Sequence, residues 1–415
     1  GLQQREQGQC SRGGSFHDSL PYLDNCGSGS SANHSIVTDM NTNQNRPFTV
    51  TIPQAELDDL QRRLHATRFA PAAPGDSWDS GTPQAYLRDL VERWKQFDWR
   101  EVEARINAHP NFITEIDGQP IHFVHVRSPV PGARALLLAH TYPGSFLEFL
   151  PLIDALTDPE NHGGRAEDAF DVVIPSAPGV GFSTPVVEAG WTTARVAHTW
   201  DTLMRRLGYD SYGVHGSDQG AMVARELAVL EPEGFQGAHV LQLFSFPSGD
   251  PSEFEGFGPK EYAALAHMQW FQSVGGYNTM NGSRPQTIAA GLSDSPVGQL
   301  AYSELFESFG NGTSLVTPEQ VLEQVTLYWL TNTAATAARY YYEEVRAARE
   351  SVVSRGRIGV AVFRDDFQTI RSLAERDNAN IQHWSEFDEG GHFAVLERPA
   401  SIVTDLRAFF GGDAR

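Results

Sequence analysis

The spacing of hydrophobic residues divides the chain into segments with different predicted structure. Between residues 46 and 112 apolar positions recur every three or four residues, which predicts helices over 53–64 and 82–97. From residue 113 onward, short apolar or alternating runs predict strands at 121–127, 135–139, 170–174, 212–214, 239–246 and 358–363. Helical patterns separate most of these runs. This alternation predicts an α/β fold with a mostly parallel sheet covered by helices on both faces.

A helical stretch rich in aromatic residues interrupts the series of strands at 247–354. We expect it to form a helical cap inserted into the sheet domain. The pattern therefore predicts five segments: an N-terminal segment 1–45, a helical arm 46–112, a first core part 113–246, the cap 247–354, and a second core part 355–415. Segment 1–45 is rich in Gly, Ser, Asn and Gln, so we expect it to be disordered or non-native, with Met40 as a candidate natural start.

Composition narrows the possible partners. The 415 residues carry a net charge of −21, which would repel nucleic acid and anionic membranes. No apolar run approaches the roughly 20 residues that a membrane-spanning helix needs. The two cysteines, Cys10 and Cys26, precede the patterned part of the chain, so we expect a cytoplasmic protein without disulfides or thiolate metal sites. No ligand cluster and no dinucleotide loop is recognisable, so we expect neither metal nor organic cofactor.

The most informative motif is Gly216-Ser217-Asp218-Gln219-Gly220, which lies between a short predicted strand and a predicted helix. It has the nucleophile-elbow pattern, with an aspartate at its centre. Glycines leave room where a strand turns at once into a helix and strains the central residue. The helix N-terminus favours negative charge there. We interpret Asp218 as a carboxylate nucleophile; a plain turn with a helix N-cap, or Ser217 one position off centre, are the alternatives.

A carboxylate nucleophile forms an ester with its substrate, and water needs a base to cleave that ester. His392 follows two glycines and precedes the last predicted helix, which makes it the candidate base. An acid must hold the imidazole, and the pair Asp365-Asp366 ends the predicted strand 358–363. We favour Asp366, with Asp365 as the alternative.

His140-Thr141-Tyr142-Pro143 follows the predicted strand 135–139. From this position the backbone N–H of Tyr142 could pair with that of Gln219 as an oxyanion hole. By itself the tetrapeptide could equally be a turn, and its place in the strand order is what favours the functional interpretation.

Together these motifs resemble the epoxide hydrolases of the microsomal type, α/β-hydrolases with an N-terminal arm, over 46–410. The resemblance includes Arg46-Pro47-Phe48, Thr67-Arg68-Phe69, Trp94-x-x-Phe97-Asp98-Trp99-Arg100 and the run 116–125. It implies that Asp218, Asp366 and His392 are the catalytic triad. It also implies two cap tyrosines that bind the epoxide oxygen, Tyr277 and, by the spacing Arg-x-Tyr, Tyr341; core packing remains the alternative for Tyr340 and Tyr342.

The resemblance predicts hydrolysis of a small-molecule epoxide to a vicinal diol through an Asp ester. We expect an aryl or bulky substrate in contact with His140, Phe182 and Trp270, and the pattern is most like bacterial members, including those of enediyne antibiotic pathways. The sequence departs from the family in Gln219, where Trp is usual, and in Thr141, where Gly is usual. A haloalkane dehalogenase-like hydrolase and a non-catalytic binding protein on the same fold are the alternatives, and a homodimer is left open.

Overall fold

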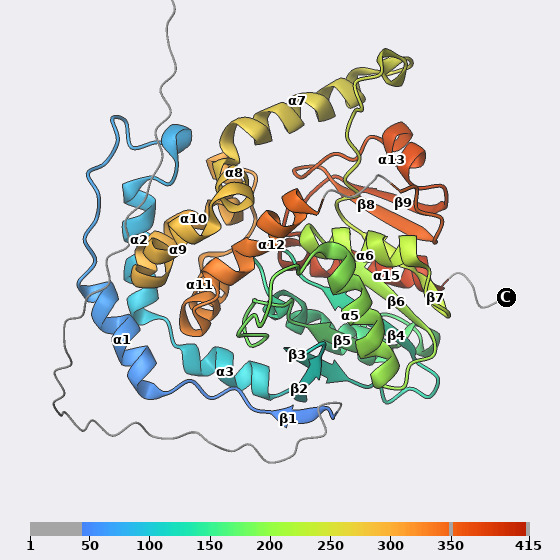
Figure 1. Ribbon diagram of the computed structural model, residues 1–415, viewed down its shortest axis with the longest axis horizontal. Coiled ribbons are helices and arrows are strands. Elements are labelled where there is room, and N and C mark those ends of the chain that lie inside the picture. Colours follow the sequence, from blue (N-terminus) through green and yellow to red (C-terminus); the bar gives the residue numbers. More distant parts are fainter. Residues whose placement is uncertain (1–43, 348–351, 412–415) are drawn as a thin grey trace, which may run out of the picture. The chain divides into compact units, whose positions relative to one another are not determined.

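The computed structural model describes residues 44–347 and 352–411 (Figure 1). The expectations for 1–43, including Met40, lie outside the described residues. Nine strands form a single sheet, in the order β1-β2-β3-β5-β4-β6-β7-β8-β9. Their bounds are β1 Arg46–Phe48, β2 Asn111–Ile116, β3 Gln119–Val126, β4 Arg134–Ala139, β5 Phe170–Pro175, β6 Tyr212–Gly216, β7 Phe235–Val240, β8 Ile358–Phe363 and β9 Ile381–Phe387.

Most of the sheet is parallel, as the alternation of strands and helices predicts. The pairs β4–β5, β4–β6, β6–β7, β7–β8 and β8–β9 are parallel, whereas β1–β2, β2–β3 and β3–β5 are antiparallel. Three strands were not predicted: β1 and β2 adjoin the arm, and β9 is an edge strand. These strands are short or only half buried, so their apolar alternation is weak.

Within the described residues, fifteen α-helices accompany the sheet. Their bounds are α1 Gln54–His65, α2 Gln84–Gln96, α3 Trp99–Asn107, α4 Ile153–Thr157, α5 Thr193–Arg206, α6 Gln219–Leu230, α7 Pro259–Val274, α8 Gly276–Ser283, α9 Pro285–Asp294, α10 Pro296–Tyr302, α11 Pro318–Thr331, α12 Ala334–Arg346, α13 Arg371–Asp377, α14 Ala394–Glu397 and α15 Pro399–Gly411. The unpredicted α3 begins after Asp98, whose side chain accepts the backbone N–H of Arg100.

Alternating side chains of the buried strands supply two hydrophobic cores, one on each face of the sheet. Leu137 of β4 packs in one core with residues of α5 and α6, while Leu136 and Leu138 pack in the other with residues of α15. All three leucines are fully buried. The strand is thus apolar on both faces, which explains why it reads as a continuous apolar run.

The described part of 247–354 contains helices α7–α12 and no strand. In Figure 1 helices α9–α11 lie beside α1 and α2 of the arm. An Arg63 guanidinium on α1 donates to the backbone carbonyl of Asp294 at the end of α9, at 2.6 Å. The arm therefore supports the cap. Among the described helices, none has the length and apolar character that crossing a bilayer requires.

One strand boundary was wrong. The run 239–246 was predicted as a strand, yet β7 ends at Val240. Residues beyond it leave the sheet, and the side chain of Gln242 turns to the backbone of Asp218. Periodicity alone could not show this departure, because Leu241 and Leu243 are still apolar and buried after the strand has ended.

Candidate active site

Asp218 lies in a strained bend between β6 and α6. Its backbone has φ 50° and ψ −115°, a conformation that a non-glycine residue rarely adopts. A Cβ at Gly216 would lie 2.1 Å from the carbonyl oxygen of Gly220, and a Cβ at Gly220 would lie 2.0 Å from that of Ala139. Both glycines are therefore required by space, and the bend holds the carboxyl at the N-terminus of α6.

Backbone donors hold the Asp218 carboxylate. The N–H of Tyr142 donates to Oδ2 at 3.1 Å, and the N–H of Gln219 also bonds to it. Burial raises the pKa of Asp218, while the charge of His392 and these two backbone donors oppose the rise. The two N–H groups predicted as an oxyanion hole thus converge on the predicted nucleophile.

His392 and Asp366 form a buried pair. His392 Nδ1 lies 2.9 Å from Asp366 Oδ1, and His392 Nε2 is buried without a hydrogen-bond partner. Burial alone would lower the pKa of His392, but the charge and hydrogen bond of Asp366 and the charge of Asp218 raise it to about 9. Asp365 instead faces Arg364 at 3.2 Å. Of the two neighbouring aspartates, only Asp366 reaches the imidazole.

Gln242 links Asp218 to this pair, although no sequence motif singled it out. Its Oε1 accepts the backbone N–H of Asp218 at 2.5 Å, and its Nε2 donates to Asp366 and to the His392 carbonyl. Gln242 is almost fully buried. Because it lies just past the end of β7, only the observed strand boundary reveals its position.

The loop after β4 is anchored by two buried side chains. His140 Nδ1 bonds to the Thr141 carbonyl at 2.8 Å, and His140 Nε2 accepts the Ala177 N–H at 3.0 Å. Both ring nitrogens are occupied by backbone, so no ring nitrogen remains for the substrate contact expected of His140. Glu148, missed from the sequence, accepts the N–H of Thr141 at 2.8 Å and its hydroxyl at 2.7 Å. Burial raises the pKa of Glu148 to about 8, against these hydrogen bonds.

Three tyrosine rings gather at the cap side of this loop. The ring of Tyr277 stacks on Tyr142 with centroids 6.1 Å apart, and Tyr341 meets Tyr142 edge-on at 5.2 Å. Tyr277 and Tyr341 share a hydrogen bond. Burial raises the pKa of both phenols well above the ordinary value, with a further contribution from the Asp218 charge. The structure thus brings the two predicted cap tyrosines to Tyr142, whose backbone N–H donates to Asp218.

The neighbouring tyrosines of α12 point elsewhere. The Tyr340 hydroxyl lies 2.6 Å from Thr193 Oγ1, and the Tyr342 ring lies beneath the guanidinium of Arg346 at 3.5 Å. Successive helix residues project about 100° apart, so only one of three adjacent tyrosines can face the site.

The two other predicted substrate contacts lie farther out. Trp270 packs against Phe309, which stacks on Tyr277, so its ring is one side chain removed from the phenols. Phe182 packs against Phe48 of the arm and against His122. The structure thus places Phe182 in a core contact with the arm.

A cavity of about 710 Å³ lies beside the site, between α6, α12 and the segment after β7. Its walls include Met222, Leu243, Phe244 and Phe246, and Gln242 connects it to Asp218 and Asp366. Asp218 and His392 themselves do not line it.

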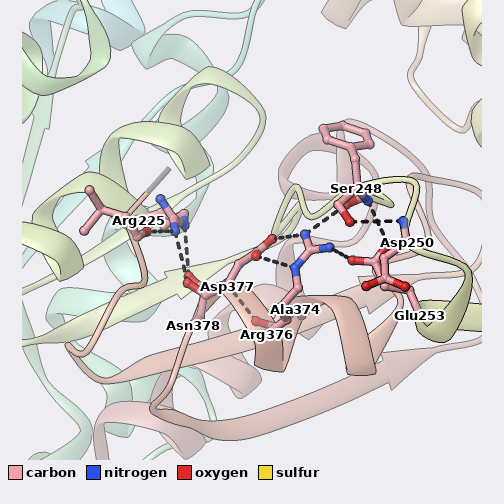
Figure 2. Close-up of polar contacts among 10 residues, drawn as sticks. Arg225, Ser248, Asp250, Glu253, Ala374, Arg376, Asp377 and Asn378 are labelled. Atoms are coloured by element: carbon pink, nitrogen blue, oxygen red, sulfur yellow. Dashed lines mark hydrogen bonds and ion pairs between the residues drawn. The ribbon is translucent and has the colours of Figure 1, made fainter. Parts of the chain in front are cut away.

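Two arginines fix the rim of this cavity (Figure 2). Arg376 bonds to Asp377 at 2.7 Å, to Glu253 and to the Phe246 carbonyl. Arg225 of α6 bonds to Asn378 at 2.9 Å. Figure 2 shows how these contacts tie the segment around Glu253, the end of α13 and α6 together. The lining of the cavity is therefore mixed, with apolar side chains beside polar and charged ones.

Known proteins match this chain along most of its length. The sequence pattern of the epoxide hydrolase N terminus matches residues 45–149, and that of the alpha/beta hydrolase fold matches 134–274. A Stigmatella aurantiaca protein whose name provisionally assigns it to the epoxide hydrolases is 42% identical over 374 residues, covering 88% of this chain and 84% of that protein. Epoxide hydrolase 1 of Sus scrofa is 30% identical over 403 residues and covers 88% of each chain.

Solved structures of epoxide hydrolases have the same fold as this chain. Aspergillus niger epoxide hydrolase superposes with a TM-score of 0.77 at 31% identity, covering 89% of this chain and 96% of that one. Juvenile hormone epoxide hydrolase from Bombyx mori gives 0.80 at 26% identity, with coverages of 89% and 94%. The chain therefore belongs to the epoxide hydrolases of the microsomal type, α/β-hydrolases in which an N-terminal arm precedes the catalytic fold.

Proposed function

We propose that this epoxide hydrolase works through an ester on Asp218, with His392 as the base and Tyr277 and Tyr341 as the acids. One observation carries the proposal: the Asp218 carboxylate sits on backbone donors beside two phenols, while the neighbouring imidazole keeps Nε2 free of partners.

In the first step an Asp218 carboxylate oxygen attacks one epoxide carbon, and the bond from that carbon to the epoxide oxygen breaks. The epoxide oxygen gains negative charge as the ring opens. A hydrogen-bonded pair of phenols can stabilise this charge and deliver a proton to it. The product is a hydroxyalkyl ester of Asp218.

In the second step His392 Nε2 removes a proton from water, and the hydroxide attacks the ester carbonyl carbon. The N–H groups of Tyr142 and Gln219 stabilise the oxyanion that forms. Collapse of this intermediate breaks the bond to the substrate oxygen, which leaves as an alkoxide and takes the proton from His392 to give the diol. The proton left on the Asp218 carboxyl returns to the tyrosinate formed in the first step. Ester formation has already removed the Asp218 charge, which lowers the proton affinity of His392 when a base is needed.

We propose a bulky or aryl epoxide as substrate. The cavity of about 710 Å³ has aromatic and aliphatic side chains beside its polar lining residues, and it reaches Gln242, which binds the backbone of Asp218. Apolar walls of this kind accommodate large hydrocarbon groups. A panel of styrene-type and bulkier aryl epoxides, scored for diol formation and stereochemistry, tests this choice; preference for small aliphatic epoxides would contradict it.

The ester mechanism is tested by a single turnover in ¹⁸O-labelled water. Label is expected in the Asp218 carboxylate and not in the first-turnover diol. Direct appearance of label in that diol would refute the ester. Asp366→Asn should slow ester hydrolysis, whereas the matched variant Asp365→Asn, whose carboxylate faces Arg364, should not.

A cytoplasmic location, a homodimer and a role in antibiotic biosynthesis remain predictions. Cysteine usage favours the first, because residues 27–415 contain no cysteine. Fractionation of the producing cells and light scattering of the purified protein test the first two.

A further inference from the structure

A second group of polar side chains lies on strands and a helix outside the proposed catalytic site. His239 of β7, His383 of β9 and Asp405 of α15 each offer one ligand atom, and these atoms lie within 4.8 Å of one another. The Nε2 atoms of the two histidines each lie 2.8 Å from a different oxygen of Asp405. The residues are far apart in sequence, so no spacing motif marks the group.

We propose that His239, His383 and Asp405 bind a divalent transition-metal ion of the zinc class. Two imidazole nitrogens and one carboxylate are a common ligand set for such ions. In a tetrahedral zinc site with bonds of about 2.0–2.1 Å, ligand atoms lie about 3.3 Å apart. The present separations of 2.8 Å between nitrogen and oxygen require only small side-chain shifts to admit an ion.

A hydroxyl group that could serve as a fourth metal ligand lies beside the three side chains, and further hydrogen bonds orient them. The Ser385 hydroxyl lies 3.0 Å from His383 Nε2 and donates to Asp405 at 2.6 Å. His239 Nδ1 lies 2.9 Å from His215 Nδ1. This contact can hold the proton of His239 on Nδ1, which leaves Nε2 free to bind a metal.

The site is buried, yet it has a route for entry. The side chains of His239 and Asp405 are 0% and 6% exposed, whereas that of His383 is 23% exposed. Metal binding requires both imidazoles to be deprotonated, and the Asp405 carboxylate then offsets one of the two charges of a divalent cation. The chain's net charge of −21 favours the approach of cations.

The bound ion would link strand β7 of the first core part to strand β9 and helix α15 of the second. His383 lies on β9 before the loop that carries His392, and Asp405 lies on α15 after it. Joining β7, β9 and α15 would fix both ends of this loop. We therefore assign the ion a structural role, independent of the proposed ester chemistry.

The test uses the full chain, freed of metal with a chelator and then gel-filtered. Zinc alone is titrated calorimetrically, bound metal is measured by elemental analysis, and the melting temperature is followed. We expect one ion per chain and a higher melting temperature. His383→Gln should weaken binding at least tenfold, whereas His198→Gln, at an exposed histidine of α5, should leave it unchanged.

Cobalt(II) gives an independent readout, because tetrahedral coordination produces intense visible absorption. This spectrum should appear with the unaltered chain and be lost in His383→Gln. If that variant fails to fold, Asp405→Asn replaces it. The proposal is overturned if the unaltered chain binds no stoichiometric zinc, or if a folded His383→Gln variant binds zinc as tightly; the group would then be a hydrogen-bond cluster only.

Discussion

The side-chain oxygen of Gln242 accepts the backbone N–H of Asp218 at 2.5 Å. The same amide donates to Asp366, so one side chain orients both the proposed nucleophile and the acid that holds the proposed base. Gln242→Met should lower kcat roughly tenfold to a hundredfold, because it leaves a strained N–H and a buried carboxylate each without one partner. Steady-state kinetics measures the effect.

Gln299→Met is the matched control for Gln242→Met. Gln299 is also buried, but it bonds to the Val325 carbonyl within the cap. We expect it to change stability more than kcat. Equal losses of kcat in the two variants would show that Gln242 has no special role in catalysis.

The two cap phenols should act as a pair. Tyr277→Phe or Tyr341→Phe alone should slow ester formation roughly tenfold, since one phenol remains, and the double variant should slow it by about 10² to 10⁴. Burst kinetics on a chromogenic epoxide separates ester formation from hydrolysis. Tyr342→Phe serves as the control, because this ring stacks on Arg346. A double variant that still forms ester at the original rate would rule out the phenols as acids.

The pKa of His392 should depend on the charge of Asp218. In the free enzyme the Asp366 and Asp218 charges raise the His392 pKa to about 9 against the effect of burial, so the imidazole is protonated at neutral pH. The ester removes one of these charges. The apparent pKa for ester hydrolysis, measured by single turnover against pH, should therefore lie below about 9, with the rate rising as pH increases through it. An apparent pKa at or above the free-enzyme value would contradict this coupling.

Glu148 should make stability depend on pH. Its pKa in the fold is about 8, raised by burial from 4.5. Between these values the folded chain holds a proton that the unfolded chain has lost. The contribution of Glu148 to the free energy of unfolding is therefore fully present below pH 4.5 and is lost as pH rises through about 8. Glu148→Gln should become more stable relative to the unaltered protein across that range, as urea unfolding at a series of pH values will measure. A constant difference between the two proteins would contradict the raised pKa.

The glycines of the bend should tolerate no side chain. Gly220→Ala puts a Cβ 2.0 Å from the Ala139 carbonyl oxygen. We therefore expect that the variant does not fold, or that its free energy of unfolding falls by at least about 2 kcal/mol. Gly291→Ala is the control, because its Cβ would meet nothing within 4 Å in helix α9. It should stabilise the protein by about 0.5–1 kcal/mol. Thermal unfolding distinguishes these outcomes.

The sequence by itself determined the α/β class, the mostly parallel sheet and the family. These follow from local patterns, such as the apolar run of β4 and the glycines around Asp218, which depend on near neighbours along the chain. Short motifs also named Asp218, His392 and Asp366 as candidate site residues, and the resemblance to the family added Tyr277 and Tyr341. The fold decided that His392 pairs with Asp366 and not with Asp365, since by the sequence alone either aspartate could face the imidazole.

Only the tertiary structure decided the roles that depend on distant segments. Gln242 lies beyond an unexpected strand end, and Glu148 bonds to a loop seven residues earlier. His140 anchors the loop because the N–H of Ala177, 37 residues away, donates a hydrogen bond to its Nε2. Hydrogen bonds between segments that are separate along the chain leave no periodic trace in it, because the fold alone brings those donors and acceptors within 3 Å.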